Sequence, residues 1–404
     1  MKTKIIILLL ASASIMAWGL DFGVDLGEEA STASTSDNSD SSDVYHEISA
    51  LMWLRKPVAD GTFSLRGGGV YTSKNEKAHP SLTSLKWTGF LDEEKRVILR
   101  GGRIASDDMS KLIGRSPMDG VGVTLKQPRF TLSGSAGYTG FLFNDDTSVI
   151  MSANDLVQLA DDDEVFGVPR ILATVSIEPV LFERHKIGFE LFSQTDMWES
   201  LDGDGKALNT QYASVRAEGA VAARLYYAVA GSLGIAERSG SDIGISGAGS
   251  GSLTWIAPKA KSFRLSAGLA AATGDSSRAS YFGEGDPGSQ FFAVVPKTYG
   301  QVLEAFAANN LIGSLLVSVK PANPLYVQAS LLPIMRLGDG AVNYTGSAEA
   351  GYTGTEADFI VSYAPTSDVR ADLKGGFFIP RDGAFVDGYD SNRWELKAQL
   401  TLAF

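Results

Sequence analysis

The last twelve residues constrain the fold of this chain most strongly, because they alternate apolar and polar side chains up to a terminal phenylalanine. One set holds Trp394, Leu396, Ala398, Leu400, Leu402 and Phe404, and the other holds Arg393, Glu395, Lys397, Gln399, Thr401 and Ala403. Since alternate side chains of a strand point to opposite faces, this strand has one apolar and one largely polar face. The pattern recurs in segments 130–139, 263–269 and 369–377. It is typical of a barrel strand between lipid and a wet interior.

A soluble β-sandwich would also alternate, but three features favour a membrane barrel. Many segments reach about 10–13 residues, whereas soluble strands centre on about 5–6 and membrane strands need about 9–11. Many apolar faces carry an aromatic residue near one end, as in interfacial girdles: Tyr71, Trp87, Tyr138, Trp255, Tyr363 and Trp394. Connections also alternate between short (56–61, 127–129, 257–261, 320–324, 365–368) and long (106–118, 144–168, 196–208, 274–308, 381–391).

Counting back from the C-terminus gives seventeen candidate strands: 392–404, 369–380, 352–364, 324–337, 309–320, 261–273, 249–257, 222–236, 209–219, 184–195, 170–179, 129–143, 119–127, 95–105, 81–91, 62–72 and 43–56. Single-chain bacterial barrels have even strand numbers, so an eighteenth strand is expected upstream. Leu20–Gly27 fits it, with Ser31–Asp43 as the first external loop. We therefore predict an all-β fold, a transmembrane antiparallel β-barrel of about eighteen strands, with sixteen as the alternative.

Two of the long connections are predicted to contain short helices. Ser152–Ala160 has Ser152 as a candidate N-cap and Asp155 three residues later, which is a helix start signal. Lys297–Ala308 is the second candidate. Either helix would pack at the surface or fold into the lumen as a constriction.

The N-terminus has the composition of an export signal. Lys2 and Lys4 precede the apolar run Ile5–Leu10, and Ala17-Trp18-Gly19 supplies small residues for cleavage. We expect residues 1–19 to be a signal peptide and residues 20–404 to form the barrel, located in the outer membrane. The absence of cysteine excludes disulfides, thiol catalysis and cysteine-ligated metals.

The polar strand faces carry more cations than acids. The alternation assigns fifteen cations to a pore-lining face: Arg55, Arg66, Lys86, Arg96, Arg100, Lys126, Arg170, Lys186, Arg216, Arg224, Arg264, Arg370, Lys374, Arg393 and Lys397. The same faces hold six acids, Glu47, Glu178, Glu190, Glu218, Asp372 and Glu395, although the net charge is −12. Charges avoid lipid in any barrel. An excess of one sign additionally favours the opposite ion in a narrow passage.

Catalytic and nucleic-acid functions find little support. Three histidines leave few options for a triad: parity places His46 toward lipid, His79 falls in a loop and His185 at a short turn. No phosphate-binding glycine loop follows a strand, and the acidic balance opposes nucleic-acid binding. We expect no enzymatic activity, no cofactor and no metal.

Several short motifs resemble the alginate-export type of outer-membrane porin. They are Leu99–Arg103 followed by Pro117–Val121, Tyr299-Gly300 followed by Asn310-Leu311 and Val319–Pro321, and Gly351–Asp358. The resemblance implies an eighteen-stranded monomeric barrel with an arginine-rich pore that passes an anionic solute. Phe404 is also similar to the terminal signal by which outer-membrane proteins reach the barrel-assembly machinery.

The sequence therefore predicts an outer-membrane porin that is surrounded by lipid and passes small, anionic solutes by passive diffusion. Two alternatives remain open at this point. One is a substrate-specific export or uptake channel for an anionic polysaccharide. The other is a surface-binding barrel whose lumen is plugged.

Overall fold

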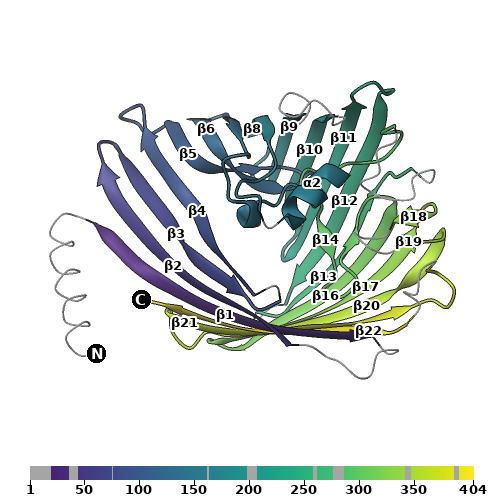
Figure 1. Ribbon diagram of the computed structural model, residues 1–404. Helices are drawn as coiled ribbons and strands as arrows, with labels where there is room; N and C mark the ends of the chain where they lie inside the picture. The colour runs from purple at the N-terminus through teal and green to yellow at the C-terminus, as the bar shows by residue number, and fades with distance from the viewer. Residues whose placement is uncertain are drawn as a thin grey trace, which may run out of the picture.

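The chain forms a closed antiparallel barrel of eighteen strands (Figure 1). The computed structural model describes residues 20–35, 44–74, 76–161, 163–197, 207–257, 262–275, 286–341, 347–385 and 391–404. The predicted signal peptide, residues 1–19, lies outside the described residues. The observed number of barrel strands is eighteen, not the alternative of sixteen.

Successive barrel strands pair with their neighbours in chain order. They are β1 Asp21–Thr35, β2 Val44–Val58, β3 Gly61–Thr72, β4 Lys77–Phe90, β5 Val97–Asp107, β6 Arg115–Gln127, β7 Phe130–Tyr138, β8 Arg170–Pro179, β9 His185–Asp196, β10 Leu208–Ala222, β11 Leu225–Arg238, β12 Gly244–Ile256, β13 Arg264–Ala272, β16 Asn310–Ala322, β17 Leu325–Arg336, β20 Gly351–Tyr363, β21 Val369–Pro380 and β22 Arg393–Ala403. The loops add β14 Thr298–Tyr299, β15 Ala305–Phe306, β18 Gly340–Ala341, β19 Ser347–Ala348, a 3₁₀ turn η1 Asn144–Asp146 and helix α2 Ala153–Ala160.

The first and last strands close the barrel. β1 pairs with β22 from Asp25↔Ala403 to Thr35↔Arg393. Val24 and Phe404 exchange both backbone hydrogen bonds, at 3.0 and 2.9 Å. This pairing leaves neither terminal strand as a free sheet edge, which a membrane barrel requires.

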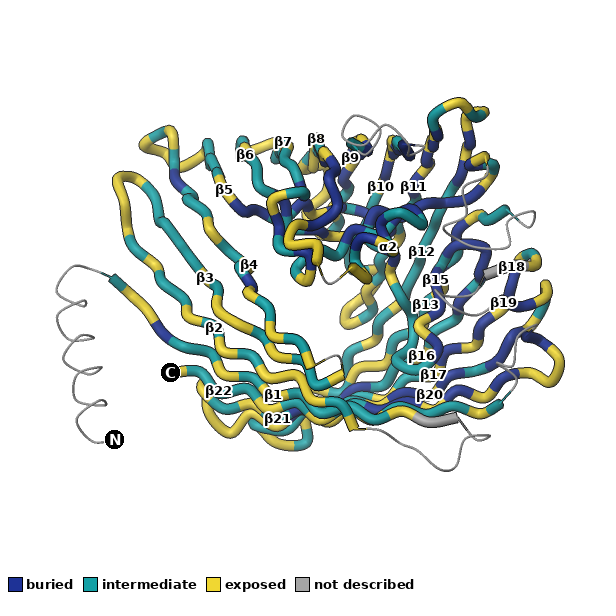
Figure 2. Tube along the Cα trace, viewed as in Figure 1, coloured by how far each residue is buried: buried dark blue, intermediate teal, exposed yellow. Residues whose placement is uncertain are grey.

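The two faces of the wall differ as the alternation predicts. On β9, Ile187, Phe189 and Leu191 face outward, while Glu190 and Gln194 face inward and are buried. The dark-blue buried residues in Figure 2 gather on the strands and loops around the inserted segments. His46 lies on the outer face, as parity places it, with its Nδ1 3.6 Å from Glu28 Oε1.

Short and long connections segregate to opposite ends of the barrel. The end that carries both termini has turns as short as 59–60, 128–129, 223–224 and 323–324. The opposite end, here called the loop end, carries the segments 108–114, 139–169, 273–309 and 381–392 among others. This is the expected separation of periplasmic turns from external loops.

Several local predictions are corrected. β1 continues to Thr35 and therefore includes residues assigned to the first loop. The strand predicted at 129–143 ends at Tyr138. α2 is confirmed, with Ser152 and Asp155 forming a capping box. The predicted helix at Lys297–Ala308 is wrong, because this segment contains the β14–β15 pair.

No helix in the described ranges is long and apolar enough to cross a membrane.

The β1–β22 closure predicts a specific cross-link. Glu29 and Gln399 are directly opposite each other. Val24 and Phe404 form a hydrogen-bonded pair, and hydrogen-bonded and non-hydrogen-bonded pairs alternate along an antiparallel ladder. Glu29 and Gln399 are therefore a non-hydrogen-bonded pair, the kind in which the two Cα atoms lie closer together. In the cysteine-free chain, Glu29→Cys with Gln399→Cys should form a disulfide upon oxidation, measured by gel mobility. We expect it to form at least about ten-fold faster than the control Glu29→Cys with Thr401→Cys, whose residues are offset diagonally. Equal rates would contradict the register.

Candidate functional site

Three loops fold into the lumen and pack against one another. They are the β5–β6 loop 108–114, the described parts of the β7–β8 loop with α2 (139–161 and 163–169), and the described parts of the β13–β16 loop (273–275 and 286–309). Buried side chains of these loops, including Ile113, Met151 and Phe292, join inward residues such as Leu172 and Phe192 in one hydrophobic cluster. Figure 1 shows α2 inside the ring of strands. The lumen is therefore narrowed on the β5–β13 side by protein with its own core.

The β5–β6 loop is shaped by one carboxylate. Asp108 accepts hydrogen bonds from the backbone N–H groups of Ser110 (2.8 Å), Ile113 (2.6 Å) and Gly114 (3.2 Å). The N–H of Met109 donates to Glu190 Oε1 on β9 at 3.0 Å. The loop is thus fastened to β9, which lines the other side of its pocket.

The β7–β8 loop is fastened by a buried charge cluster. Arg170 on β8 has no exposed surface, and its Nη2 lies 2.8 Å from Asp155 Oδ2 of α2 and 3.1 Å from Asp196 Oδ2 of β9. Asp155 also accepts from the N–H groups of Met151 and Ser152. Removing one partner of a buried ion pair costs about 3–5 kcal/mol, so this cluster holds α2 firmly.

The β13–β16 loop is fastened at two points. The Tyr212 hydroxyl of β10 donates to the Phe292 carbonyl. The buried Glu356 carboxylate of β20 accepts from the N–H groups of Val302 (2.7 Å) and Leu303 (2.9 Å). Gly300 has φ +85°, and a Cβ there would lie 2.5 Å from the Glu356 carboxyl carbon, so a glycine is needed at this approach.

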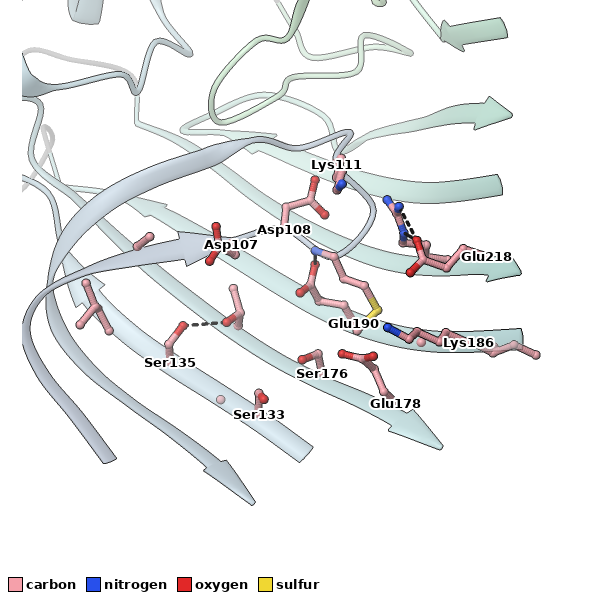
Figure 3. A pocket seen from close by; sticks show the side chains of 18 of the residues that line it. Asp107, Asp108, Lys111, Ser133, Ser135, Ser176, Glu178, Lys186, Glu190 and Glu218 are labelled. Atoms are coloured by element: carbon pink, nitrogen blue, oxygen red, sulfur yellow. Dashed lines mark hydrogen bonds and ion pairs between the residues drawn. The ribbon is translucent and has the colours of Figure 1, made fainter. Parts of the chain in front are cut away.

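A polar pocket of about 400 Å³ lies between the β5–β6 loop and the wall. Its charged lining comprises Arg100, Asp107, Asp108, Lys111, Glu178, Lys186, Glu190, Arg216 and Glu218, and its hydroxyls are those of Ser133, Ser135, Thr174 and Ser176. Figure 3 shows the Lys186 ammonium and the Glu178 carboxylate pointing into the same part of this space. The pocket therefore offers cations, hydroxyls and at least one carboxylate to a solute.

The cations of this pocket differ in whether they have a hydrogen-bond or ion-pair partner. Arg216 pairs with Glu218 at 2.8 Å, and Arg100 donates to the Thr124 hydroxyl at 2.6 Å. Among the described residues, the ammonium groups of Lys111 and Lys186 have no hydrogen bond or ion pair. Burial lowers the pKa of nearby Lys297, and the charges of Lys111 and Arg216 lower it further. The pocket lining thus holds four cations and five acids, and among the described residues the ammonium groups of Lys111 and Lys186 are the cations without a hydrogen bond or ion pair.

The structure distributes the fifteen predicted pore-lining residues unevenly. Arg100, Lys186 and Arg216 line the pocket. Arg170 is enclosed between Asp155 and Asp196. Arg96 and Arg224 lie in turns, which places them off the wall. By strand register and face, the remainder point toward the interior: Arg55, Arg66, Lys86, Lys126, Arg264, Arg370, Lys374, Arg393 and Lys397.

More acids face the interior than the alternation identified. Asp25, Glu29, Asp196, Glu356 and Asp358 join the predicted acids on inward positions. Several are already paired, such as Asp25 with Arg66 at 2.8 Å. The wall as a whole is therefore more balanced in sign than predicted.

Loop residues of the pocket were missed by the strand analysis. Asp107, Asp108 and Lys111 lie at or beyond the end of β5, where alternation carries no information. An aspartate followed two residues later by serine, as in Asp108–Ser110, is a local turn signal that would have marked this loop as structured.

His79 belongs to β4 rather than to a loop, and its Nδ1 lies 3.5 Å from Asp145 of η1. His185 is the first residue of β9, and its Nδ1 lies 3.0 Å from the Tyr227 hydroxyl. In the described parts of the chain, no group of three His, Asp or Glu side chains is arranged to hold a metal ion.

Comparison with solved structures finds barrels from Pseudomonas aeruginosa. OpdO has a TM-score of 0.62 at 12% identity, over 95% of this chain and 97% of OpdO. OccK2 (OpdF), in complex with glucuronate, has a TM-score of 0.62 at 8% identity over 95% and 98%. The outer membrane protein OpdK has 0.58 at 11% over 95% and 99%. No family model and no curated protein sequence matches the chain.

At these identities the likeness establishes the fold. The resemblance to alginate-export porins rests on the short sequence motifs alone.

The Asp108 network predicts a defined effect on the constriction. Asp108→Ala leaves buried N–H groups unsatisfied, which should lower the free energy of unfolding by about 2–3 kcal/mol. It should also loosen the loop and raise open-channel current and noise in planar bilayers. The control is Asp107→Ala, whose partner is the exposed Arg115 at 2.8 Å. Identical behaviour of both variants would contradict the anchoring role.

Proposed function

We propose that this protein is an outer-membrane channel for the passive diffusion of small polar solutes that carry a carboxylate or another anionic group. The single observation that carries the proposal is the polar pocket of about 400 Å³ between the β5–β6 loop and the wall, where the ammonium groups of Lys111 and Lys186 have no hydrogen bond or ion pair among the described residues. A barrel with inward charge and inserted loops conducts without catalytic residues, and lumen charge sets its ion preference. The OccK2 structure in complex with glucuronate is consistent with such a solute.

The pocket composition favours a hydroxylated anion. Ser133, Ser135, Thr174 and Ser176 come from the neighbouring strands β7 and β8 and face the same space as the two lysines. A carboxylate can bind the ammonium groups while hydroxyls of the solute bind the wall. Each contact is exchangeable with water, so the solute is recognised without being trapped.

The other two functions predicted from the sequence fit the geometry less well. A polysaccharide channel needs a continuous path for a polymer, whereas loops with a hydrophobic core occupy the β5–β13 side of the lumen. A plugged, purely surface-binding barrel would not need unengaged cations inside. Export of an anionic polysaccharide, as the alginate-export resemblance implies, remains a second and less favoured proposal.

Biogenesis is part of the proposal. Residues 1–19 would direct export and be removed, and the C-terminal strand would be presented to the barrel-assembly machinery. Support for the second step comes from β22, which ends in an alternating strand whose terminal Phe404 is exposed.

Charge reversal at the pocket tests the solute preference. Lys186→Glu should lower the anion-to-cation permeability ratio, because a unit charge about 6 Å from an ion interacts by about 3 kcal/mol at an effective dielectric of about 20, before salt screening. Reversal potentials in a salt gradient provide the measurement. The matched control is Arg224→Glu, in the turn before β11. An unchanged ratio for Lys186→Glu would remove the basis for the proposed anion preference.

Removal of Phe404 tests the assembly step. Deletion should reduce the amount of folded barrel in the outer membrane several-fold, measured as heat-modifiable migration on gels. Deletion also removes two backbone hydrogen bonds with Val24, so refolding of the purified variant in detergent serves as the control. A variant that refolds normally yet accumulates poorly supports recognition of the terminus. Normal accumulation in cells would contradict it.

A further inference from the structure

The barrel wall is split between β4 and β5. These strands share five residue pairs, from Lys86↔Gly102 to Phe90↔Ile98, whereas other neighbouring strands share from eight to fourteen. Gly102 has φ +106°, and a Cβ there would lie 2.2 Å from the Leu85 carbonyl oxygen. β5 turns away from β4 at this glycine, so residues 77–85 of β4 have no partner in the ladder on this side.

Side chains close the split where the ladder is missing. Arg103 is buried, and its Nη1 donates to the Leu82 carbonyl at 2.7 Å while its Nη2 donates to the Phe141 carbonyl at 2.9 Å. Asp119 holds the same guanidinium through two hydrogen bonds of 3.0 and 2.8 Å. An unpaired backbone edge is not tolerated against lipid, and here one cation satisfies part of it.

The 3₁₀ turn η1 completes the closure from the loop side. Asp146 accepts from the Ser81 hydroxyl and from the Leu82 N–H, both at 2.7 Å. Asp145 lies 3.6 Å from Lys77 Nζ and 3.5 Å from His79 Nδ1. Two loop carboxylates therefore occupy a site on β4 made of a lysine, a histidine, a hydroxyl and a backbone N–H. These groups together bind an anion.

The outer side of the split carries one ion pair covered by aromatic side chains. Arg103 is opposite Asp119, and Asp119 is opposite Tyr138, all on the outward face. Tyr138 packs edge-to-face on Phe141, with ring centroids 4.9 Å apart, and Phe141 is exposed. The split thus joins an anion-binding inner edge to a lipid-facing outer edge.

We propose that the split between β4 and β5 is a lateral portal, closed by η1, for an amphiphile with an anionic head group and a hydrocarbon chain. The head group takes the place of Asp145 and Asp146 on β4 as η1 withdraws, while the chain enters the surrounding lipid. A purely hydrophilic anion gains nothing from this exit, because charge is costly to move into hydrocarbon. The portal is separate from axial conduction and does not depend on it.

A disulfide latch tests the portal in the cysteine-free chain. In Ser81→Cys with Asp146→Cys, oxidation ties η1 to β4, because the native side-chain oxygens lie 2.7 Å apart. The control is Ser214→Cys with Ser232→Cys, whose oxygens lie 3.0 Å apart across the fourteen-pair β10–β11 ladder. Asp145→Asn with Asp146→Asn weakens the latch without a cross-link.

The probe is a dodecyl sulfate analogue with a photoreactive diazirine in its chain, added to phosphatidylcholine proteoliposomes. Cross-links to inward residues of the split, Ser84 and Lys86, are mapped by mass spectrometry. We expect the oxidised latch to reduce them several-fold, reduction to restore them, the Asn variant to increase them and the control disulfide to leave them unchanged. Heat-modifiable migration verifies folding, and disulfide formation is verified by mass.

Two results would overturn the portal. Cross-links to Ser84 and Lys86 that persist in the oxidised latch would show that the amphiphile arrives along the axis. Cross-links confined to the outer face in every variant, including the Asn variant, would show that the split does not open. Axial anion conductance is recorded on the same variants, so failure of the channel proposal is seen separately.

Discussion

Backbone pairing is the constraint on which the rest of this structure depends, because a peptide group exposed to hydrocarbon has no water to replace a missing partner. The barrel meets this constraint by pairing β1 with β22, where Val24 and Phe404 exchange both backbone hydrogen bonds. Closure fixes the parity of every strand. Parity in turn places most strand leucines toward lipid and most strand arginines toward the interior, so the polar lumen is a consequence of the closed ladder before any solute is considered.

The β4–β5 split shows what replaces the ladder where it stops. Arg103 and Asp146 supply a donor and an acceptor to the Leu82 peptide group. A side-chain closure differs from a ladder in one respect: it depends on a few contacts from a separate loop, so it opens by moving that loop rather than by unzipping a strand. The same loop is held at its other end by Arg170 and Asp155, which limits such a movement to η1 and its neighbours.

The period-two pattern predicted most strands because each barrel strand has an apolar environment on one face and a polar one on the other. Apolar and polar residues therefore alternate along the strand, and this alternation can be read locally from the sequence. The α2 start was predictable for a similar reason, since Ser152 and Asp155 cap their own helix. β1 was under-predicted because its second half is polar on both faces, with Glu28 outward beside His46. The 297–308 segment was misread as a helix, because its conformation is set by distant groups such as Glu356. The pocket residues Lys111 and Asp108 were missed because loop insertion is a tertiary event.

The number of inward-facing charges does not give the ion selectivity of such a barrel, because some of these charges form the ion pairs and hydrogen bonds that hold the loops in the lumen. Arg170 is shared by Asp155 and Asp196, and Glu356 accepts hydrogen bonds from backbone N–H groups. The field of each of these charges at a passing solute is reduced, because a partner of opposite charge or a hydrogen-bond donor lies within about 3 Å. Lys111 and Lys186 are different, because each faces the pocket without a partner among the described residues. The charge that a solute meets is therefore set by the groups that remain without a close partner after the loops have been fastened, and at the pocket these include the ammonium groups of Lys111 and Lys186.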